Sequence, residues 1–211
     1  MRHYRPFFLI RKIFAKAVFR IKTDEKILCL TFDDGPNPGS TYRILNILDN
    51  YQVKAIFFLT GLNVEKYPGI KELIVAKGHQ LGNHGYLHKK GCTTSSENYA
   101  KNISMAARLI PSDYYRPPYG SLTPKQYHNI LKYYTLIFWD LMPYDFSRSH
   151  SAGRCLRILK EKIRPGSIIV LHDNPSSIVT EFLAEFIESA TGEGYKFVVP
   201  VFAKPEKNKL R

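Results

Sequence analysis

The chain has 211 residues, of which 44% are hydrophobic and 23% charged, as is typical of one globular domain with a full core. Its three cysteines form no Cys-x-x-Cys pair, which excludes a zinc ribbon and gives no support to a disulfide framework. The net charge of +13 favours anionic partners. A nucleic-acid binder is the alternative that charge alone suggests. Because no nucleic-acid-binding motif accompanies the basic residues, we expect no such partner.

The first 22 residues are basic and contain no acidic residue. Their longest uninterrupted apolar run, residues 7–10, is too short for the hydrophobic region of a cleavable signal peptide. Apolar residues recur at helical spacing, with basic residues on another face: Ile10, Ile13, Phe14, Ala17, Val18 and Ile21 against Lys12, Lys16 and Arg20. The pattern predicts an amphipathic helix that is too short and too charged to span a membrane.

This N-terminal helix has two candidate partners, the domain that follows it and an anionic membrane. The connection to the first expected strand, residues 22–25, is short, so we expect the helix to pack on the domain. Peripheral membrane contact through the basic face would be additional. We therefore expect a cytoplasmic or peripherally membrane-associated protein without a transmembrane helix.

From residue 26 onward, short apolar segments alternate with helical patterns. Strands are expected at residues 26–31, 54–60, 80–83, 114–116, 134–139, 167–171 and 196–199. Helices are expected at residues 40–50, 64–77, 95–110, 123–131, 152–163 and 176–190. The alternation predicts an α/β fold with a parallel sheet, either open or closed into a barrel. The domains are expected at residues 1–25, 26–202 and 203–211, the last being a basic tail.

Polar side chains follow five of the expected strands. In chain order these are Asp33 and Asp34, His84, Arg116, Asp140 and Asp145, and His172. In parallel α/β folds, the loops beyond the carboxyl ends of the strands carry the chemistry. We therefore expect these side chains to lie together at one end of the sheet.

Two adjacent carboxylates after a buried strand repel each other unless a positive group holds them. His84 and His88 are one helical turn apart, so both imidazoles can reach one ion. With Asp34 they form a set of two histidines and one carboxylate, which suits Zn²⁺ or a similar divalent ion and leaves positions open for water and substrate. Such a centre permits hydrolysis, because a bound water becomes acidic near neutral pH.

Five motifs occur in an order that resembles the NodB-homology polysaccharide deacetylases, carbohydrate esterase family four. They are residues 31–36 (TFDDGP), 83–88 (NHGYLH), 116–120 (RPPYG), 145–146 (DF) and 169–173 (IVLHD). The resemblance covers residues 26–199. It implies a distorted (β/α) barrel with an incomplete count of about seven strands. It also implies a hydrolase that removes N-acetyl groups from amino sugars of a polysaccharide or cell-envelope glycan.

The resemblance also assigns roles to residues. Asp33 would be the general base, and one divalent ion, Zn²⁺ or alternatively Co²⁺ or Ni²⁺, would bind Asp34, His84 and His88. Arg116 would hold Asp33, and the backbone N–H of Tyr119 would bind the oxyanion. His172 would protonate the leaving amine, and Asp145 would tune the pKa of His172. The pocket for the acetyl methyl group would be lined by Pro117, Phe146 and Leu171.

Two positions depart from the family pattern. Gly85 replaces a Ser or Thr whose hydroxyl braces the loop, and Phe146 stands where Trp is common. We expect Trp139 to lie in the core and Asp140 to have a structural role.

Other activities stay open. They are a non-catalytic glycan-binding domain, an O-acetyl esterase and a cyclic amide hydrolase. The particular glycan and the oligomeric state are not predicted.

Overall fold

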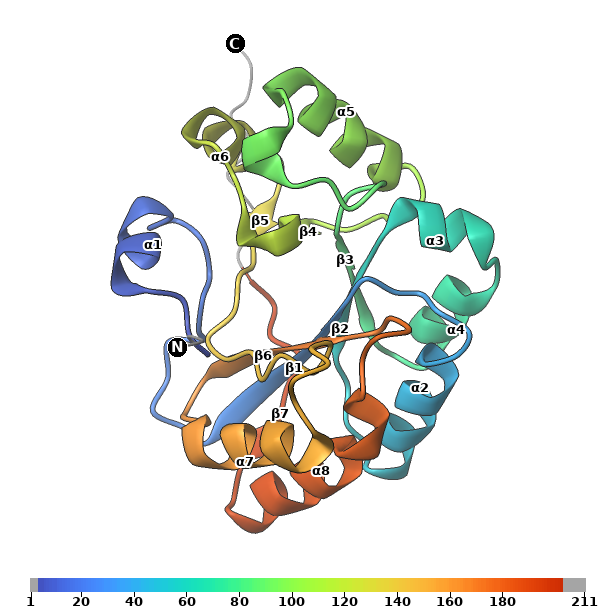
Figure 1. Ribbon diagram of the computed structural model, residues 1–211, viewed down its shortest axis with the longest axis vertical. Helices are drawn as coiled ribbons and strands as arrows, with labels where there is room; N and C mark the ends of the chain where they lie inside the picture. The colour runs from blue at the N-terminus through green and yellow to red at the C-terminus, as the bar shows by residue number, and fades with distance from the viewer. Residues whose placement is uncertain (1–3, 203–211) are drawn as a thin grey trace.

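The computed structural model describes residues 4–202 (Figure 1), so the predicted tail at residues 203–211 lies outside the described part. The strands are β1 (Ile27–Asp33), β2 (Ile56–Leu59), β3 (Gln80–Asn83), β4 (Tyr114–Tyr115), β5 (Thr135–Leu136), β6 (Ser167–His172) and β7 (Lys196–Phe197). The helices are α1 (Phe8–Ile13), α2 (Thr41–Asn50), α3 (Gly61–Lys66), α4 (Ile70–Ala76), α5 (Ser96–Ala107), α6 (Pro124–Ile130), α7 (Ala152–Lys162) and α8 (Leu183–Gly192).

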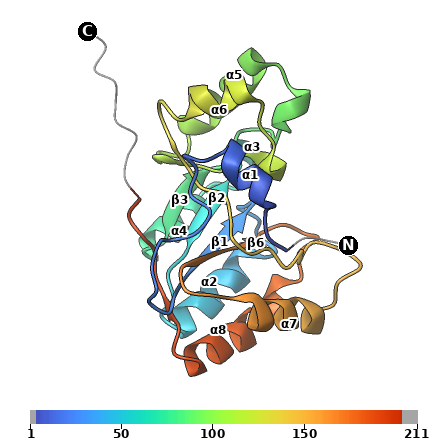
Figure 2. The ribbon, with the colours of Figure 1, turned by 90° about the vertical axis from the view of Figure 1, so that its left-hand side faces the viewer.

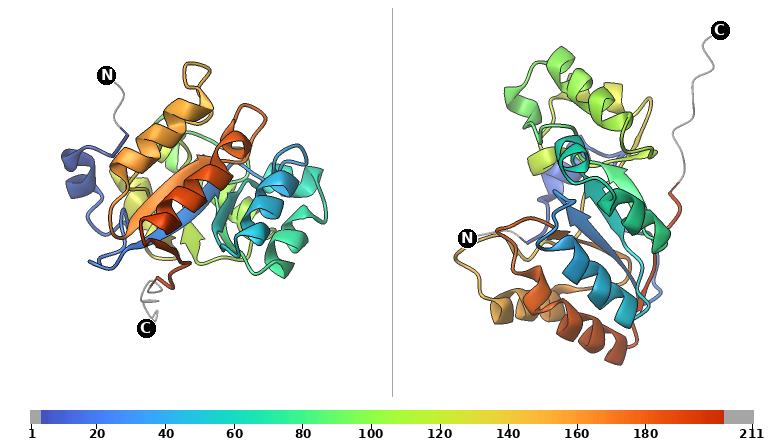
Figure 3. Two further views of the ribbon diagram at one scale, coloured as in Figure 1. Left: turned by 90° about the horizontal axis from the view of Figure 1, so that it is seen from below. Right: turned by 90° about the vertical axis from the view of Figure 1, so that its right-hand side faces the viewer.

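The seven strands form one curled sheet in the order β5-β4-β3-β2-β1-β6, with β7 pairing a second stretch of β1. Every ladder between these described strands is parallel. Helices surround the outer face, with α2–α4 on one side and α7 and α8 side by side below (Figures 1 and 3). The predicted incomplete (β/α) barrel is confirmed.

One chain segment joins the two edges of the sheet. Ile137 follows β5 and donates its N–H to the carbonyl of Tyr115 at the end of β4. Four residues later, Leu141 donates to Ile168 and accepts from Val170, both on β6. Residues 135–141 therefore run from one edge of the sheet to the other and close the half-barrel.

Alternation along β1 determines which side chains face the barrel interior. Leu28, Leu30 and Phe32 belong to the large core between the sheet and its helices. Cys29 belongs to a separate interior cluster, and Asp33 lies an even number of residues further on. Since strand side chains alternate between faces, β1 delivers Asp33 to the interior, at the carboxyl end of the sheet.

The expected helix at residues 64–77 is two helices. Gly69 lies between α3 and α4 with φ of 86°, a left-handed conformation that a side chain disfavours, and Pro68 precedes it. The helical period continues across the break, so periodicity alone did not reveal it. The last expected helix likewise begins later, with a short 3₁₀ turn (Val179–Glu181) before α8.

The N-terminal helix is shorter than predicted. It ends at Ile13 and is followed by a turn at residues 14–16, after which isolated bridges join Val18 to Ile137 and Arg20 to Ser167. The predicted packing on the domain is confirmed for Ile10 and Phe14, whereas Ile13 of the same predicted apolar stripe is 62% exposed. Phe14 and Phe19 are buried, and their rings stack on Phe138 with centroids 5.3 and 4.8 Å away. The apolar spacing beyond residue 13 thus reflects pairing with the barrel, not a longer helix.

Asp140 has the structural role expected of it. It is fully buried and accepts hydrogen bonds from Arg11, Arg164 and Ser167, with Arg5 3.5 Å away. Burial opposes its ionisation, but the arginines and Ser167 lower the pKa of Asp140 to about 2. This cluster ties the N-terminal segment to the end of α7 and the start of β6.

Phe14→Ala should destabilise the protein strongly, whereas Phe8→Ala should not. The two side chains are identical, but Phe14 is 6% exposed and Phe8 is 68% exposed. Removing a buried Phe costs about 3–5 kcal/mol, which lowers the melting temperature of a domain of this size by roughly 10 °C. Thermal unfolding of the two variants measures the difference. Equal melting temperatures would show that the N-terminal segment contributes no packing energy.

Candidate active site

The two adjacent aspartates point to different partners. Asp33 is the last residue of β1, in register with His172 on β6 and with Phe58 on β2. Asp34 begins the turn with a φ of 77°, and Asn63 and Thr60 hold its backbone carbonyl. The left-handed conformation at Asp34 changes the direction of the chain. Asp33 is therefore still part of the strand, whereas Asp34 is the first residue of the turn.

Arg116 is fully buried and fixes Asp33. Its guanidinium donates to Asp33 Oδ1 at 2.6 Å and to Thr31 Oγ1 at 2.7 Å, both on β1. It also donates to the carbonyls of Ile137 and Phe138 in the closing segment at 3.0 and 2.8 Å. Every nitrogen of the guanidinium is thereby hydrogen-bonded, which a buried charge requires. The ion pair with Arg116 thus fixes the position of the Asp33 side chain.

Asp34, His84 and His88 come together as predicted. Their candidate ligand atoms all lie within 4.8 Å of one another, with the Nε2 atoms of His88 and His84 3.0 and 3.5 Å from Asp34 Oδ1. His84 Nδ1 lies 2.8 Å from the carbonyl of Arg116, a contact that puts the proton on Nδ1 and leaves Nε2 free as a ligand.

Asp34 Oδ1 is buried without a hydrogen-bond partner among the described residues. A buried carboxylate oxygen that faces two imidazole nitrogens fits a divalent cation, and the nitrogen and oxygen donors suit zinc. Burial opposes the ionisation of Asp34, yet His84 and His88 hold its pKa well below the usual range. The three residues could therefore hold a metal ion.

His84 and His88 lie on a loop, so the expectation that one helical turn separates them is wrong. The loop is shaped by positive φ at Gly85 (79°) and His88 (51°). Asn102 on α5 braces it by accepting from Leu87 N–H through its side chain and from Tyr86 N–H through its carbonyl. A Cβ at position 85 would lie 2.6 Å from Asn102 Nδ2. Asn102 therefore supplies the brace that the hydroxyl missing at Gly85 would have given.

His172 and Asp145 form a second pair across the site. His172 Nδ1 lies 2.9 Å from Asp145 Oδ1, and the backbone N–H of His172 donates to Asp145 Oδ2. Burial disfavours the charged imidazole, but Asp145, with Asp34 and Asp33, outweighs it and raises the pKa of His172 to about 9. His172 is thus a proton donor at neutral pH.

Three residues near the site were missed in the sequence. Asn174 donates to Asp34 Oδ2 at 2.7 Å, and Ser177 donates to Asp145 Oδ2 at 2.6 Å. Asp173 is buried and accepts hydrogen bonds from the hydroxyls of Ser40 and Thr41. These bonds connect the turn after β1 to the end of β6. No sequence motif marks Asn174 and Ser177; only their nearness to His172 offered a signal.

A cleft of about 510 Å³ opens over these groups. It is lined by Asp33, Asp34, His88, Pro117, Tyr119, Gly120, Trp139, Met142, Tyr144, Phe146, Val170, His172 and Asn174. Pro117 and Phe146 line it as expected, and the Phe146 ring lies 4.4 Å from that of His172. The Tyr119 ring is 66% exposed and packs against His88.

Two expectations about the cleft wall are wrong. Leu171 is fully buried in the core between sheet and helices, and its neighbour Val170 lines the cleft instead. Strand alternation explains the difference, because Val170 and His172 share one face of β6. Trp139 lines the cleft as well, packed beside Gly120, where a Cβ would lie 2.7 Å from the indole.

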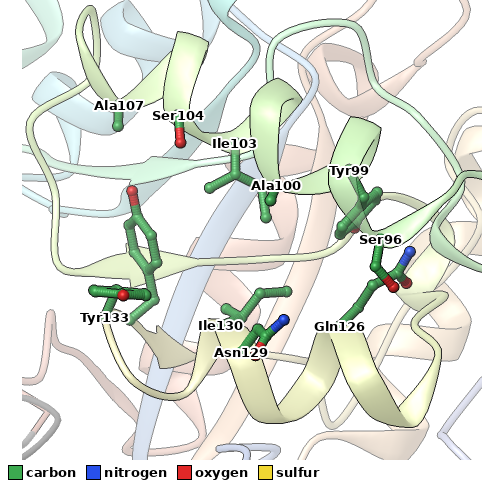
Figure 4. A pocket seen from close by; sticks show the side chains of 11 residues that line it. Ser96, Tyr99, Ala100, Ile103, Ser104, Ala107, Gln126, Asn129, Ile130 and Tyr133 are labelled. Carbon is green, nitrogen blue, oxygen red and sulfur yellow. The ribbon is translucent and has the colours of Figure 1, made fainter.

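A second hollow of about 420 Å³ lies between α5 and α6 (Figure 4). The described side chains that line it include no carboxylate, imidazole or thiol: Ser96, Tyr99, Ala100, Ile103, Ser104, Ala107, Gln126, Asn129, Ile130, Tyr133 and Tyr134. Its described lining offers no metal-ligand set, and its titratable groups are tyrosines alone, so the chemistry is placed in the first cleft.

Comparison with known proteins agrees with this geometry. Residues 20–138, more than half of the chain, match the family described as polysaccharide deacetylase. The chain belongs to this family. Its activity is that of a carbohydrate deacetylase, a hydrolase that removes acetyl groups.

Two relatives illustrate the similarity of this deacetylase to bacterial proteins. A peptidoglycan-N-acetylglucosamine deacetylase of Bacillus cereus is 27% identical over 86% of the chain and 90% of its own length. A chitooligosaccharide deacetylase of Azorhizobium caulinodans is 31% identical over 73% of the chain and 77% of its own length.

Solved structures show the same fold. A peptidoglycan N-acetylglucosamine deacetylase superimposes with a TM-score of 0.81 at 30% identity, over 87% of this chain and 90% of that one. A pseudoenzyme of the same family from Bacillus anthracis superimposes with a TM-score of 0.77 at 27% identity, over 86% of this chain and 66% of that one. The fold is therefore compatible with an inactive site, and the argument for activity in this deacetylase depends on its own residues. Within the described part of the chain, no helix has the length and apolarity to cross a membrane.

Proposed function

We propose that the protein is a metal-dependent deacetylase that removes N-acetyl groups from amino sugars of a bacterial cell-envelope glycan. One observation carries the proposal. One site brings together a three-ligand set (Asp34, His84 and His88), a carboxylate held by an arginine, and a histidine held by a carboxylate. A glycan-binding domain without activity has no need of two proton-transfer groups beside a metal site.

Asp34, His84 and His88 would hold the metal, which would supply Lewis-acid chemistry toward the acetyl carbonyl and the attacking water. Zn²⁺ suits the nitrogen and oxygen donors, with Co²⁺ and Ni²⁺ as alternatives. Asp33 accepts the proton of the attacking water, and the hydrogen bond from Arg116 holds its carboxylate in place. The backbone N–H of Tyr119 donates to the oxyanion of the tetrahedral intermediate.

The leaving amine must be protonated, because an amide anion is a poor leaving group. His172, which lines the cleft, supplies this proton, and Asp145 fixes its orientation and keeps it charged. The apolar side chains of Val170, Phe146 and Pro117 would surround the acetyl methyl group.

The names of relatives support the substrate class. Those relatives include deacetylases of peptidoglycan and of chitooligosaccharides, both of which carry N-acetylated amino sugars. Mass spectrometry of products from chitin oligomers, peptidoglycan fragments and acetylxylan tests the proposal. A loss of one acetyl mass from the first or second substrate is expected. Turnover of acetylxylan alone would replace the proposal with an O-acetyl esterase.

Removing the metal should abolish activity. The metal supplies several kcal/mol of transition-state stabilisation, so treatment with EDTA should lower turnover about a hundred-fold or more. Added Zn²⁺ or Co²⁺ should restore it, as measured by acetate release. The Asp34→Asn variant is the control, because its low activity should not respond to added metal. Unchanged turnover in protein shown to be metal-free would overturn the metal-dependent mechanism.

A further inference from the structure

No residue of the short helix α1 is buried. Phe8 is 68% exposed, Leu9 69% and Ile13 62%, within six residues of chain. Single exposed apolar side chains are ordinary, but neighbouring ones mark an interaction surface. Figures 1 and 2 show α1 standing out from the sheet, on the side away from α2–α4.

The exposed face cannot be hidden by turning the helix, because the opposite face is anchored. Ile10 and Phe14 pack into the cluster around Phe138, and Arg11 is paired with Asp140. At 100° per residue, Phe8, Leu9 and Ile13 fall on the other side of the helix. Lys12 lies among them, with its ammonium 4.7 Å from the centre of the Phe8 ring.

The surroundings of this face are cationic. No acidic residue occurs among the first 22, and Lys12 and Lys16 are both exposed. Behind the helix, Arg5, Arg11 and Arg164 share the one carboxylate of Asp140, so positive charge is in excess there too. Apolar side chains beside lysines are the composition of helices that lie in the interface of an anionic bilayer.

We propose that this face, formed by Phe8, Leu9, Lys12, Ile13 and Lys16, docks on an anionic phospholipid bilayer. The apolar side chains enter the boundary between headgroups and acyl chains, and the lysines contact lipid phosphates. A second copy of the chain is a poorer occupant, because it would bring the same lysines and another net charge of +13 against the face.

The chain segment just before the docking face borders the cleft. Tyr4, just before α1, accepts a hydrogen bond through its carbonyl from the N–H of Met142, and the side chain of Met142 lines the cleft. A bilayer bound by α1 would therefore hold the cleft near the membrane surface. The proposal itself does not depend on which glycan is the substrate.

Vesicle co-sedimentation of the full chain tests the proposal. Vesicles of phosphatidylglycerol and phosphatidylcholine should bind the protein at least about ten-fold more strongly than pure phosphatidylcholine, and added salt should weaken the binding. Phe8→Ser with Leu9→Ser, and separately Lys12→Glu with Lys16→Glu, should each lower the binding by about ten-fold or more.

Matched controls change exposed apolar side chains and exposed lysines elsewhere. Val75→Ser with Met105→Ser, and Lys101→Glu with Lys125→Glu, alter exposed positions on α4, α5 and α6 and should keep binding within about two-fold of the wild type. All variants should retain acetate release from soluble oligomers, which shows that they fold. Vesicle binding that is absent, insensitive to lipid charge, or unaffected by the α1 variants would overturn the proposal. A dimer in sedimentation velocity that Phe8→Ser with Leu9→Ser dissociates, without vesicle binding, would assign the face to a second copy.

Discussion

Asp33→Asn is expected to lower turnover by about 10²–10⁴-fold while the protein still binds its metal, whereas Asp34→Asn should lose the metal as well. The adjacent residues differ because Asp33 faces Arg116 and Asp34 faces the two histidines. An asparagine at position 33 can still accept a hydrogen bond from Arg116, but it cannot take a proton from water.

Metal content by elemental analysis and acetate release on the same samples separate the two roles. Because Asp33→Asn removes the counter-charge of a fully buried arginine, its stability should also fall, and melting curves must show that the assayed sample is folded. Equal metal content in the two variants would contradict the assignment of Asp34 as a ligand and Asp33 as the base.

His172→Ala should lower turnover of N-acetyl substrates by about 10²–10⁴-fold and turnover of activated aryl acetates much less. The amine must be protonated as it leaves, whereas a phenolate with a low pKa leaves without help. Steady-state assays of both substrates with the same enzyme samples measure the difference. Equal losses would assign His172 to binding or structure, not to proton donation.

The pH dependence provides an independent check of the same role. The pKa of His172 is raised to about 9, so the imidazole is charged below that pH and neutral above it. Wild-type turnover of amides should therefore fall above about pH 9. In Asp145→Asn the main raising influence is gone, and the alkaline fall should begin at lower pH.

The sequence was sufficient to predict that most residues of the candidate site lie together. Parallel strands joined by helices put their carboxyl ends at one edge, so residues following separate strands, such as Asp34 and His172, could be expected to meet. The assignment of Val170 was also within reach. If His172 is to act in the cleft, its side chain must face the cleft. Side chains of a strand alternate between its two faces, so Val170, not Leu171, lies on the same face as His172.

Other features depended on contacts that no local pattern encodes. Asn174 donates a hydrogen bond to Asp34, which is 140 positions away in the sequence. No local sequence pattern predicts that its side-chain amide holds this candidate metal ligand. The length of α1 was overestimated because residues 14–21 have helical apolar spacing, whereas a turn at residues 14–16 ends the helix and Val18 pairs with Ile137. Tertiary pairing overrode the local preference.

Arg116 also has a consequence for the order in which the chain folds. Its guanidinium joins Thr31 and Asp33 to Ile137 and Phe138, segments more than a hundred residues apart. Contacts of such high sequence separation form late, because a long loop must close first. Trp139, the one tryptophan of the chain, follows Phe138 and lines the cleft, so its fluorescence reports on this closure. During refolding, that signal and catalytic competence should return together, and a partly folded chain has no partial activity.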